Sequence, residues 1–172
     1  MGSGKSTLGR ALSRATGLRL IDLDTYIEQR FHASVRDLFA QRGEDGFRDL
    51  ERRMLLEVAD FEDVIVACGG GTPCFFDNVE RMNAAGTTVM LRASHDRLLQ
   101  RLIQGRHKRP LIAAMSDREL SEYITSAQLR REPFYSRAAH EFNSDRLDDL
   151  RQIDQSVKEF ISRFNLPTVK PQ

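Results

Sequence analysis

The sequence predicts an α/β domain of three layers, in which a parallel sheet lies between helices. Two observations support this fold class. Short apolar runs rich in β-branched residues alternate with longer segments whose apolar residues recur at helical spacing. Loops rich in glycine or aspartate follow several of these runs, and ligands bind at the carboxyl ends of parallel strands. The 172 residues contain no internal repeat or domain boundary, so we expect one domain.

Three apolar runs are expected to form strands, each of them short. The expected strands are residues 18–22 (LRLID), 64–68 (VIVAC) and 87–91 (TTVML). The second and third runs read as strands buried on both faces of a parallel sheet.

Helical spacing and capping residues place the helices. Ser34 with Asp37, and Ser116 with Glu119, have the spacing of capping boxes, and Pro133 is expected to end the helix that Ser116 opens. The expected helices are residues 7–16, 34–39, 44–58, 77–85, 94–102, 116–132 and 153–164.

The composition excludes several classes of function. The formal net charge is +1, so no overall field attracts nucleic acid, and anions must be bound by local clusters. No stretch approaches the roughly 18 apolar residues of a membrane helix, and the first residues hold no signal-peptide core. Cys68 and Cys74 have no metal-site spacing, which favours reduced thiols in the cytoplasm. We therefore predict a cytoplasmic protein that binds neither nucleic acid nor membranes.

The first motif is a phosphate-binding loop. The residues are Gly2, Ser3, Gly4, Lys5, Ser6 and Thr7, directly before a helix, and they match the second half of G-x-x-x-x-G-K-[ST]. Glycines let backbone N–H groups approach phosphate oxygens, and the helix N-terminus adds partial positive charge. Lys5 can reach the β- and γ-phosphates, and Ser6 can ligate Mg²⁺. The alternative is a flexible glycine-rich terminus.

The first glycine of that motif, and the strand that normally leads into it, would lie before Met1. In folds of this kind that strand is central in the sheet. We therefore expect the sheet of this chain to lack its first central strand, with strand edges left unpaired. We also expect the native protein to begin further upstream, which a mass measurement of its N-terminus would test.

Three further groups of residues lie at expected strand ends or helix ends. Asp22 and Asp24, two apart on an expected strand, would face the same side as a metal-supporting and an acceptor-binding carboxylate; the alternative is helix capping. The run Gly69–Gly71 suggests close approach of a ligand to the backbone, or else a tight turn.

Arginines make up the last group. Arg48 has Glu44 and Glu51 as possible helix partners, and Arg131 follows Arg130 near a helix end. The aperiodic segment 104–115, which includes Arg109, is either a solvated loop or a lid that brings positive charge onto a transferring phosphate.

Taken in order, the motifs resemble the shikimate kinase family of P-loop kinases from residue 1 to about 164. These motifs are GSGKST, LIDLD, GFRDLE, CGGGTP, RPLI and RREPFY. The remaining residues, 165–172, are expected to be a frayed tail.

The resemblance implies transfer of the γ-phosphate of ATP to the 3-hydroxyl of shikimate, with Mg²⁺, by a monomer of the aromatic amino-acid pathway. It assigns residues 2–7 and the lid residue Arg109 to ATP, and Ser6 to Mg²⁺, with Asp22 supporting the metal through water. It assigns Asp24, Arg48, Gly70 and Arg131 to shikimate, and it makes Lys5, Asp24 and Arg109 the catalytic residues. Arg101 and Arg146 are candidates near the adenine.

Two alternatives stay open. One is a kinase of another small hydroxylated acid, such as gluconate, because two arginines indicate a carboxylate without naming its bearer. The other is a non-catalytic domain related to shikimate kinase, which the missing strand favours and the retained Lys5 and Asp24 disfavour.

Overall fold

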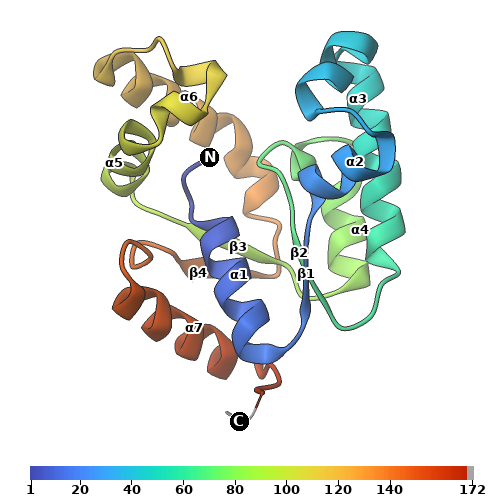
Figure 1. Cartoon of the computed structure of the whole chain (residues 1–172), viewed down its shortest axis with the longest axis vertical. Coiled ribbons are helices and arrows are strands. Elements are labelled where there is room, and N and C mark those ends of the chain that lie inside the picture. Colours follow the sequence, from blue (N-terminus) through green and yellow to red (C-terminus); the bar gives the residue numbers. More distant parts are fainter. Residues whose placement is uncertain (170–172) are drawn as a thin grey trace.

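A computed structural model describes residues 1–169, without the side chains of Lys108 and Pro110, and it confirms the α/β class (Figure 1). The strands are β1 (Arg19–Asp22), β2 (Val64–Ala67), β3 (Val89–Arg92) and β4 (His140–Asn143). The α-helices are α1 (Lys5–Thr16), α2 (Leu23–Phe31), α3 (Val35–Ala59), α4 (Asn78–Ala85), α5 (His95–Gln104), α6 (Asp117–Tyr135) and α7 (Leu150–Phe164). Three short 3-10 helices are η1 (Thr72–Cys74), η2 (Arg106–Lys108) and η3 (Pro110–Ile112).

The strands form two separate parallel pairs instead of one sheet. β1 pairs with β2, from Arg19 opposite Val64 to Asp22 opposite Ala67. β3 pairs with β4, with Val89 opposite His140 at the start. Within residues 1–169 no strand is hydrogen-bonded between β2 and β3, as the expected loss of a central strand requires. Each of these two strands therefore keeps one edge without a backbone partner.

Helices cover both faces of the strands, which gives the three layers (Figure 1). The alternation along β2 shows this directly, because successive side chains of a strand point to opposite faces. Ile65 packs in a core with Leu8 and Leu12 of α1, and α7 closes the same core. Val64 and Val66 pack on the other face against a core built from α2 and α3.

The β3–β4 pair is arranged in the same way. Phe142 of β4 is 1% exposed and packs in the α1–α7 core, where its ring meets Phe160 edge to face. On the other face Arg92 at the end of β3 donates to Glu132 of α6 at 2.8 Å. A third core, between α5, α6 and the segment after α5, contains the fully buried Ile112.

The prediction of strands buried on both faces was wrong for β2 and β3. Three of the four β2 residues and all four of β3 are only half-buried. A cavity of about 1680 Å³ is lined by residues of both strands, so their side chains lack the neighbouring strand that would cover them. The apolar runs nevertheless form strands, because their β-branched residues fit a pleated backbone.

Several element bounds differ from the sequence prediction, and one strand was missed. Helix α6 continues through Pro133 to Tyr135. A proline in the last turn removes one backbone hydrogen bond, and the helix end is still closed by the N–H of Ser136, which donates to Glu132 O at 2.9 Å. Strand β4 was not predicted at all, because its sequence HEFN has a single buried residue, Phe142.

The tail is ordered where the structure describes it. The prediction of fraying was wrong for residues 165–169, because the N–H of Val169 donates to Ala15 O at 3.0 Å and Leu166 packs in the α1–α7 core. Residues 170–172 of the expected tail lie outside the described part. Among the helices of residues 1–169, none combines the length and the apolar character needed to cross a membrane.

Candidate active site

The phosphate-binding loop has the backbone geometry that its glycines suggested. Gly2 and Gly4 adopt left-handed φ angles of 79° and 84°, which glycine alone reaches without steric cost. Gly4 is also the N-cap of α1, and no side chain caps this helix end. A Cβ at Gly4 would collide with Leu147. The first N–H groups of α1 therefore remain available to an anion.

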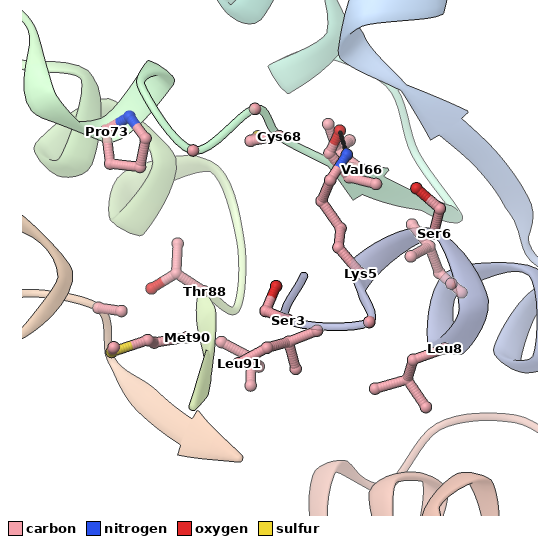
Figure 2. Close-up of a pocket in the computed structure, with 18 of the residues that line it drawn as sticks. Ser3, Lys5, Ser6, Leu8, Val66, Cys68, Pro73, Thr88, Met90 and Leu91 are labelled. Atoms are coloured by element: carbon pink, nitrogen blue, oxygen red, sulfur yellow. Dashed lines mark hydrogen bonds between the residues drawn. The ribbon is translucent and has the colours of Figure 1, made fainter. Parts of the chain in front are cut away.

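Lys5 and Ser6 meet Asp22 at the end of β1. The Lys5 ammonium donates to Asp22 Oδ2 at 3.1 Å and to Ala67 O at 3.4 Å, and the Ser6 hydroxyl donates to Asp22 Oδ2 at 3.5 Å. Figure 2 shows Lys5 between Val66 and Cys68 on one side and Met90 and Leu91 on the other. Asp22 is the N-cap residue of α2, but its side chain makes no capping hydrogen bond, which disfavours the helix-capping alternative for it.

Asp24 lies at the site, but on a helix and not on the strand where it was predicted. The strand ends at Asp22, and Asp24 lies in the first turn of α2, so the two carboxylates do not share one face of a strand. They are nevertheless close enough to interact. Burial raises the pKa of Asp24, Lys5 opposes this rise, and repulsion from Asp22 and Glu51 adds to it.

Three cations from distant parts of the chain converge on the N-terminal end of the phosphate loop. The charges of Arg131, Arg109 and Lys5 all act at Met1, directly before this loop. All three side chains line the large cavity. Arg109 is folded back, with its Nη1 donating to Gly105 O at 2.8 Å. Segment 104–115 thus places Arg109 at the cavity, and the fully buried Ile112 anchors the same segment in the third core.

The run Gly69–Gly71 is where protein side chains approach the backbone. None of the three glycines has a positive φ, so they are not required by a left-handed turn. A Cβ would lie 3.2 Å from Asp24 Oδ1 at Gly69, 2.8 Å from Arg131 Nη1 at Gly70 and 2.8 Å from Arg48 Nη2 at Gly71. The absence of three Cβ atoms therefore lets three predicted site residues gather along one loop.

Arg48 is held by the buried carboxylate of Glu51 behind this loop. Its Nη1 donates to Glu51 Oε2 at 2.8 Å, and Glu51, only 2% exposed, also accepts from the hydroxyl of Thr72 at 2.6 Å. The exposed Glu44 lies 3.5 Å from Nη2. Both helix partners suggested by the sequence are present, and the pair with Glu51 fixes the direction of the guanidinium. Arg48 stands behind Gly71 and does not line the large cavity.

Arg131 and Tyr135, one turn apart on α6, face Gly70 together. The Tyr135 hydroxyl donates to Gly70 O at 2.7 Å, which fixes the orientation of this peptide. The thiol of Cys74 lies near both arginines. Burial raises its pKa, whereas the charges of Arg131 and Arg48 lower it. Because Arg131 lies against Gly70 and Arg48 against Gly71, the two arginines stand beside neighbouring residues of one loop.

The sequence did not identify Thr72 and Tyr135 as site residues, and it treated Glu51 only as a helix partner. Their contacts join segments far apart in the chain, so the only local signal was the spacing of Arg131 and Tyr135 on one helix face. Of the adenine candidates, Arg101 lines the large cavity and donates to Asp148 at 2.7 Å, whereas Arg146 lines a separate small pocket.

We predict that Gly71→Ala displaces the Arg48 guanidinium and lowers the free energy of unfolding by about 1–3 kcal/mol, because the new methyl group overfills a packed site. Thermal denaturation and a crystal structure of the variant would measure both effects. Gly86→Ala is the matched control, since a Cβ there meets no atom within 4 Å. An unmoved Arg48 with unchanged stability would contradict this explanation of the glycine.

Comparison with known proteins places these residues in context. The family model described as shikimate kinase matches residues 1–164. A shikimate kinase of Phocaeicola vulgatus is 54% identical over 165 residues, which cover 96% of this chain and 94% of that protein. A shikimate kinase of Flavobacterium johnsoniae is 39% identical over 165 residues, covering 94% of this chain and 92% of that one.

Solved structures give the same result. The crystal structure of the shikimate kinase from Bacteroides thetaiotaomicron has a TM-score of 0.93 and 48% identity, and the match covers 96% of this chain and 94% of that one. The shikimate kinase from Acinetobacter baumannii, solved in complex with shikimate, has a TM-score of 0.79 and 26% identity over 96% and 89% of the two chains. The chain belongs to the shikimate kinase family.

Proposed function

We propose that this kinase transfers the γ-phosphoryl group of ATP to the 3-hydroxyl of shikimate. The observation that carries the proposal is the run Gly69–Gly71, which sets a carboxylate, Asp24, and two arginines, Arg131 and Arg48, along one loop beside the phosphate-binding loop. A carboxylate suits a hydroxylated ring, and arginine forks suit a planar carboxylate, so the loop matches both ends of shikimate.

On the donor side, residues 2–7 receive the phosphates. The open N-terminus of α1 presents backbone N–H groups, and Lys5 supplies a positive charge at the end of β2. Arg109 would leave Gly105 and turn its guanidinium toward the transferring group, as the lid role requires. Phosphoryl transfer needs positioning and charge neutralisation above all, and these groups provide both.

Mg²⁺ is proposed to bind between Ser6 and Asp22. The residues present fit such an ion, because the Ser6 hydroxyl can ligate it directly and Asp22 Oδ2, 3.5 Å from that hydroxyl, can hold a water bound to the ion. Among the described residues no three His, Cys, Asp or Glu side chains form a metal cluster, so phosphates and water would complete the coordination. The bound ion would neutralise charge on the phosphate oxygens.

On the acceptor side, Arg48 and Arg131 are proposed to bind the carboxylate of shikimate. Glu51 holds Arg48 through Nη1, and among the described residues the exposed Glu44, at 3.5 Å, is the sole ion-pair partner of Nη2. Such a surface pair contributes little, so an incoming carboxylate can replace Glu44. Gly70, whose carbonyl accepts from the Tyr135 hydroxyl, would contribute a backbone contact to the substrate.

Asp24 is proposed to accept the hydrogen bond of the attacking hydroxyl. Its raised pKa, caused first by burial, makes it a better proton acceptor than an exposed aspartate. The nearby charge of Lys5 opposes this rise in pKa and so favours the ionised, proton-accepting form of the carboxylate. The predicted monomeric state and cytoplasmic location belong to the same proposal and rest on the family resemblance.

An acceptor panel tests this function against the two alternatives. We expect ADP release from ATP and Mg²⁺ to be stimulated by shikimate and not by gluconate or a nucleoside monophosphate. Of these acceptors only shikimate combines a carboxylate, for the arginines, with a hydroxylated carbon ring, for Asp24. Stimulation by gluconate alone would favour the other sugar-acid kinase. No turnover with any acceptor, despite measurable binding of shikimate, would favour a non-catalytic domain.

We predict that Arg131→Ala raises the KM for shikimate about ten- to a thousand-fold and changes the KM for ATP little, because a charged partner of the carboxylate is lost. Lys5→Ala should instead lower kcat roughly a hundred- to a thousand-fold, because it acts on charge in the transition state. Steady-state kinetics separate the two effects. The neighbouring Arg130, which donates to Ser126, provides the control Arg130→Ala. Equal changes in the KM for ATP across all three variants would contradict these roles.

We predict that Asp24→Asn abolishes turnover and yet stabilises the fold at neutral pH. The pKa of Asp24 is raised above 3.8 in the folded state, so the buried charge costs stability at any pH where the carboxylate is ionised. Below about pH 4 the group is protonated in folded and unfolded states, and the advantage of the variant should vanish. Denaturant unfolding as a function of pH measures this difference, with the exposed Asp45→Asn as the control.

A further inference from the structure

Three phenylalanine rings surround the guanidinium of Arg48. Its Cζ lies 5.4 Å from the ring centre of Phe39, 5.5 Å from that of Phe47 and 4.2 Å from that of Phe75. Phe39 and Phe47 belong to α3, the helix of Arg48 itself, and stack on one another with ring centres 4.1 Å apart. Phe75 is the nearest ring, and it comes from the loop that follows η1.

The position of Phe75 is fixed by buried contacts on both sides of it in the sequence. Before it, the hydroxyl of Thr72 donates to Glu51, and Thr72 is fully buried. After it, the side-chain amide of the fully buried Asn78 donates to Thr72 O at 2.8 Å. The ring is therefore held against Arg48 by the same segment that carries the glycines of the site.

The guanidinium of Arg48 lies in a largely water-free environment, where contact with an aromatic ring stabilises a cation most. Its side chain is only 14% exposed, and its Nε is buried without a hydrogen-bond partner among the described residues. A cation against an aromatic face is stabilised most where water is excluded. Guanidinium N–H groups donate in the plane of the fork, so a ring over Cζ does not block the direction that a carboxylate uses.

We propose that Phe75 is a positioning residue for the acceptor carboxylate, acting through Arg48. The inference rests on the proposed function, in which Arg48 binds that carboxylate. Phe75 holds the guanidinium in one plane and keeps water from its face, so that Nη2 is presented to the substrate in a fixed direction.

The next residue provides a matched control. Phe76 lies 4.9 Å from Cζ of Arg52, one helical turn after Arg48, so two neighbouring rings face two arginines of one helix. Phe76 is 51% exposed, however, and Arg52 forms an ion pair with Asp77 at 2.6 Å. The contact between Phe76 and Arg52 therefore lies at the protein surface, outside the proposed site.

The test compares Phe75→Leu, Phe75→Tyr, Phe76→Leu and Arg48→Ala. Phe75→Leu should raise the KM for shikimate roughly three- to thirty-fold, with kcat and the KM for ATP unchanged, because it removes the aromatic face from a desolvated cation. Phe75→Tyr retains the ring and should restore the parent KM. Phe76→Leu should behave as the parent.

A neutral probe separates positioning of charge from general damage. Affinity for the methyl ester of shikimate, measured by calorimetry, should be the same in Phe75→Leu and the parent, because the ester lacks the charge that Arg48 binds. An equal loss for ester and acid, or a parallel loss in the KM for ATP, would overturn the proposal. A parental KM for shikimate in Phe75→Leu would also overturn it.

The same panel separates this inference from the proposed function. If Arg48→Ala raises the KM for shikimate and Phe75→Leu does not, only the role of Phe75 is wrong. If Arg48→Ala leaves the affinity for shikimate unchanged, both the role of Phe75 and the assignment of Arg48 are overturned.

Discussion

The buried carboxylate of Glu51 is the contact on which the acceptor side of the site depends. It accepts from Arg48 of its own helix and from Thr72 of the loop after β2, at 2.8 and 2.6 Å. A charge that is 2% exposed is tolerated only with such partners, since loss of one leaves it unpaired in the interior. The pair therefore ties α3 to the glycine loop and sets where Arg48, Phe75 and the loop lie relative to one another.

The donor side is built on a different principle. Backbone geometry creates the phosphate-binding loop, through Gly2 and Gly4 in left-handed conformations and an uncapped start of α1. This loop lies in the cavity between two strand pairs, and Lys5 bridges to Asp22 and Ala67 at the carboxyl ends of β1 and β2. Donor and acceptor sides meet at Asp24, whose carboxylate is near enough to feel the charges of both Lys5 and Glu51.

Local signals in the sequence were sufficient for the phosphate loop, for the alternation of strands and helices, and for placing Asp22 and Gly69–Gly71 at strand ends and Arg131 near a helix end. They failed where the cause lies in tertiary structure. Asp24 was expected on a strand but lies on a helix, because the chain turns at Asp22. Tyr135 and Thr72 act through contacts with residues 65 and 21 positions away, which no local pattern records. The glycine run was read as space for a ligand, and the structure adds that the space admits Asp24, Arg131 and Arg48.

A crystal structure of this chain with shikimate is the most direct test of the account. We expect the carboxylate of shikimate to lie within hydrogen-bonding distance of Arg131 and Arg48, where it replaces Glu44 at Nη2, and a ring hydroxyl to contact Asp24 beside Gly69. A carboxylate bound instead at Lys5 and the phosphate loop, with Arg48 still paired to Glu44, would contradict it.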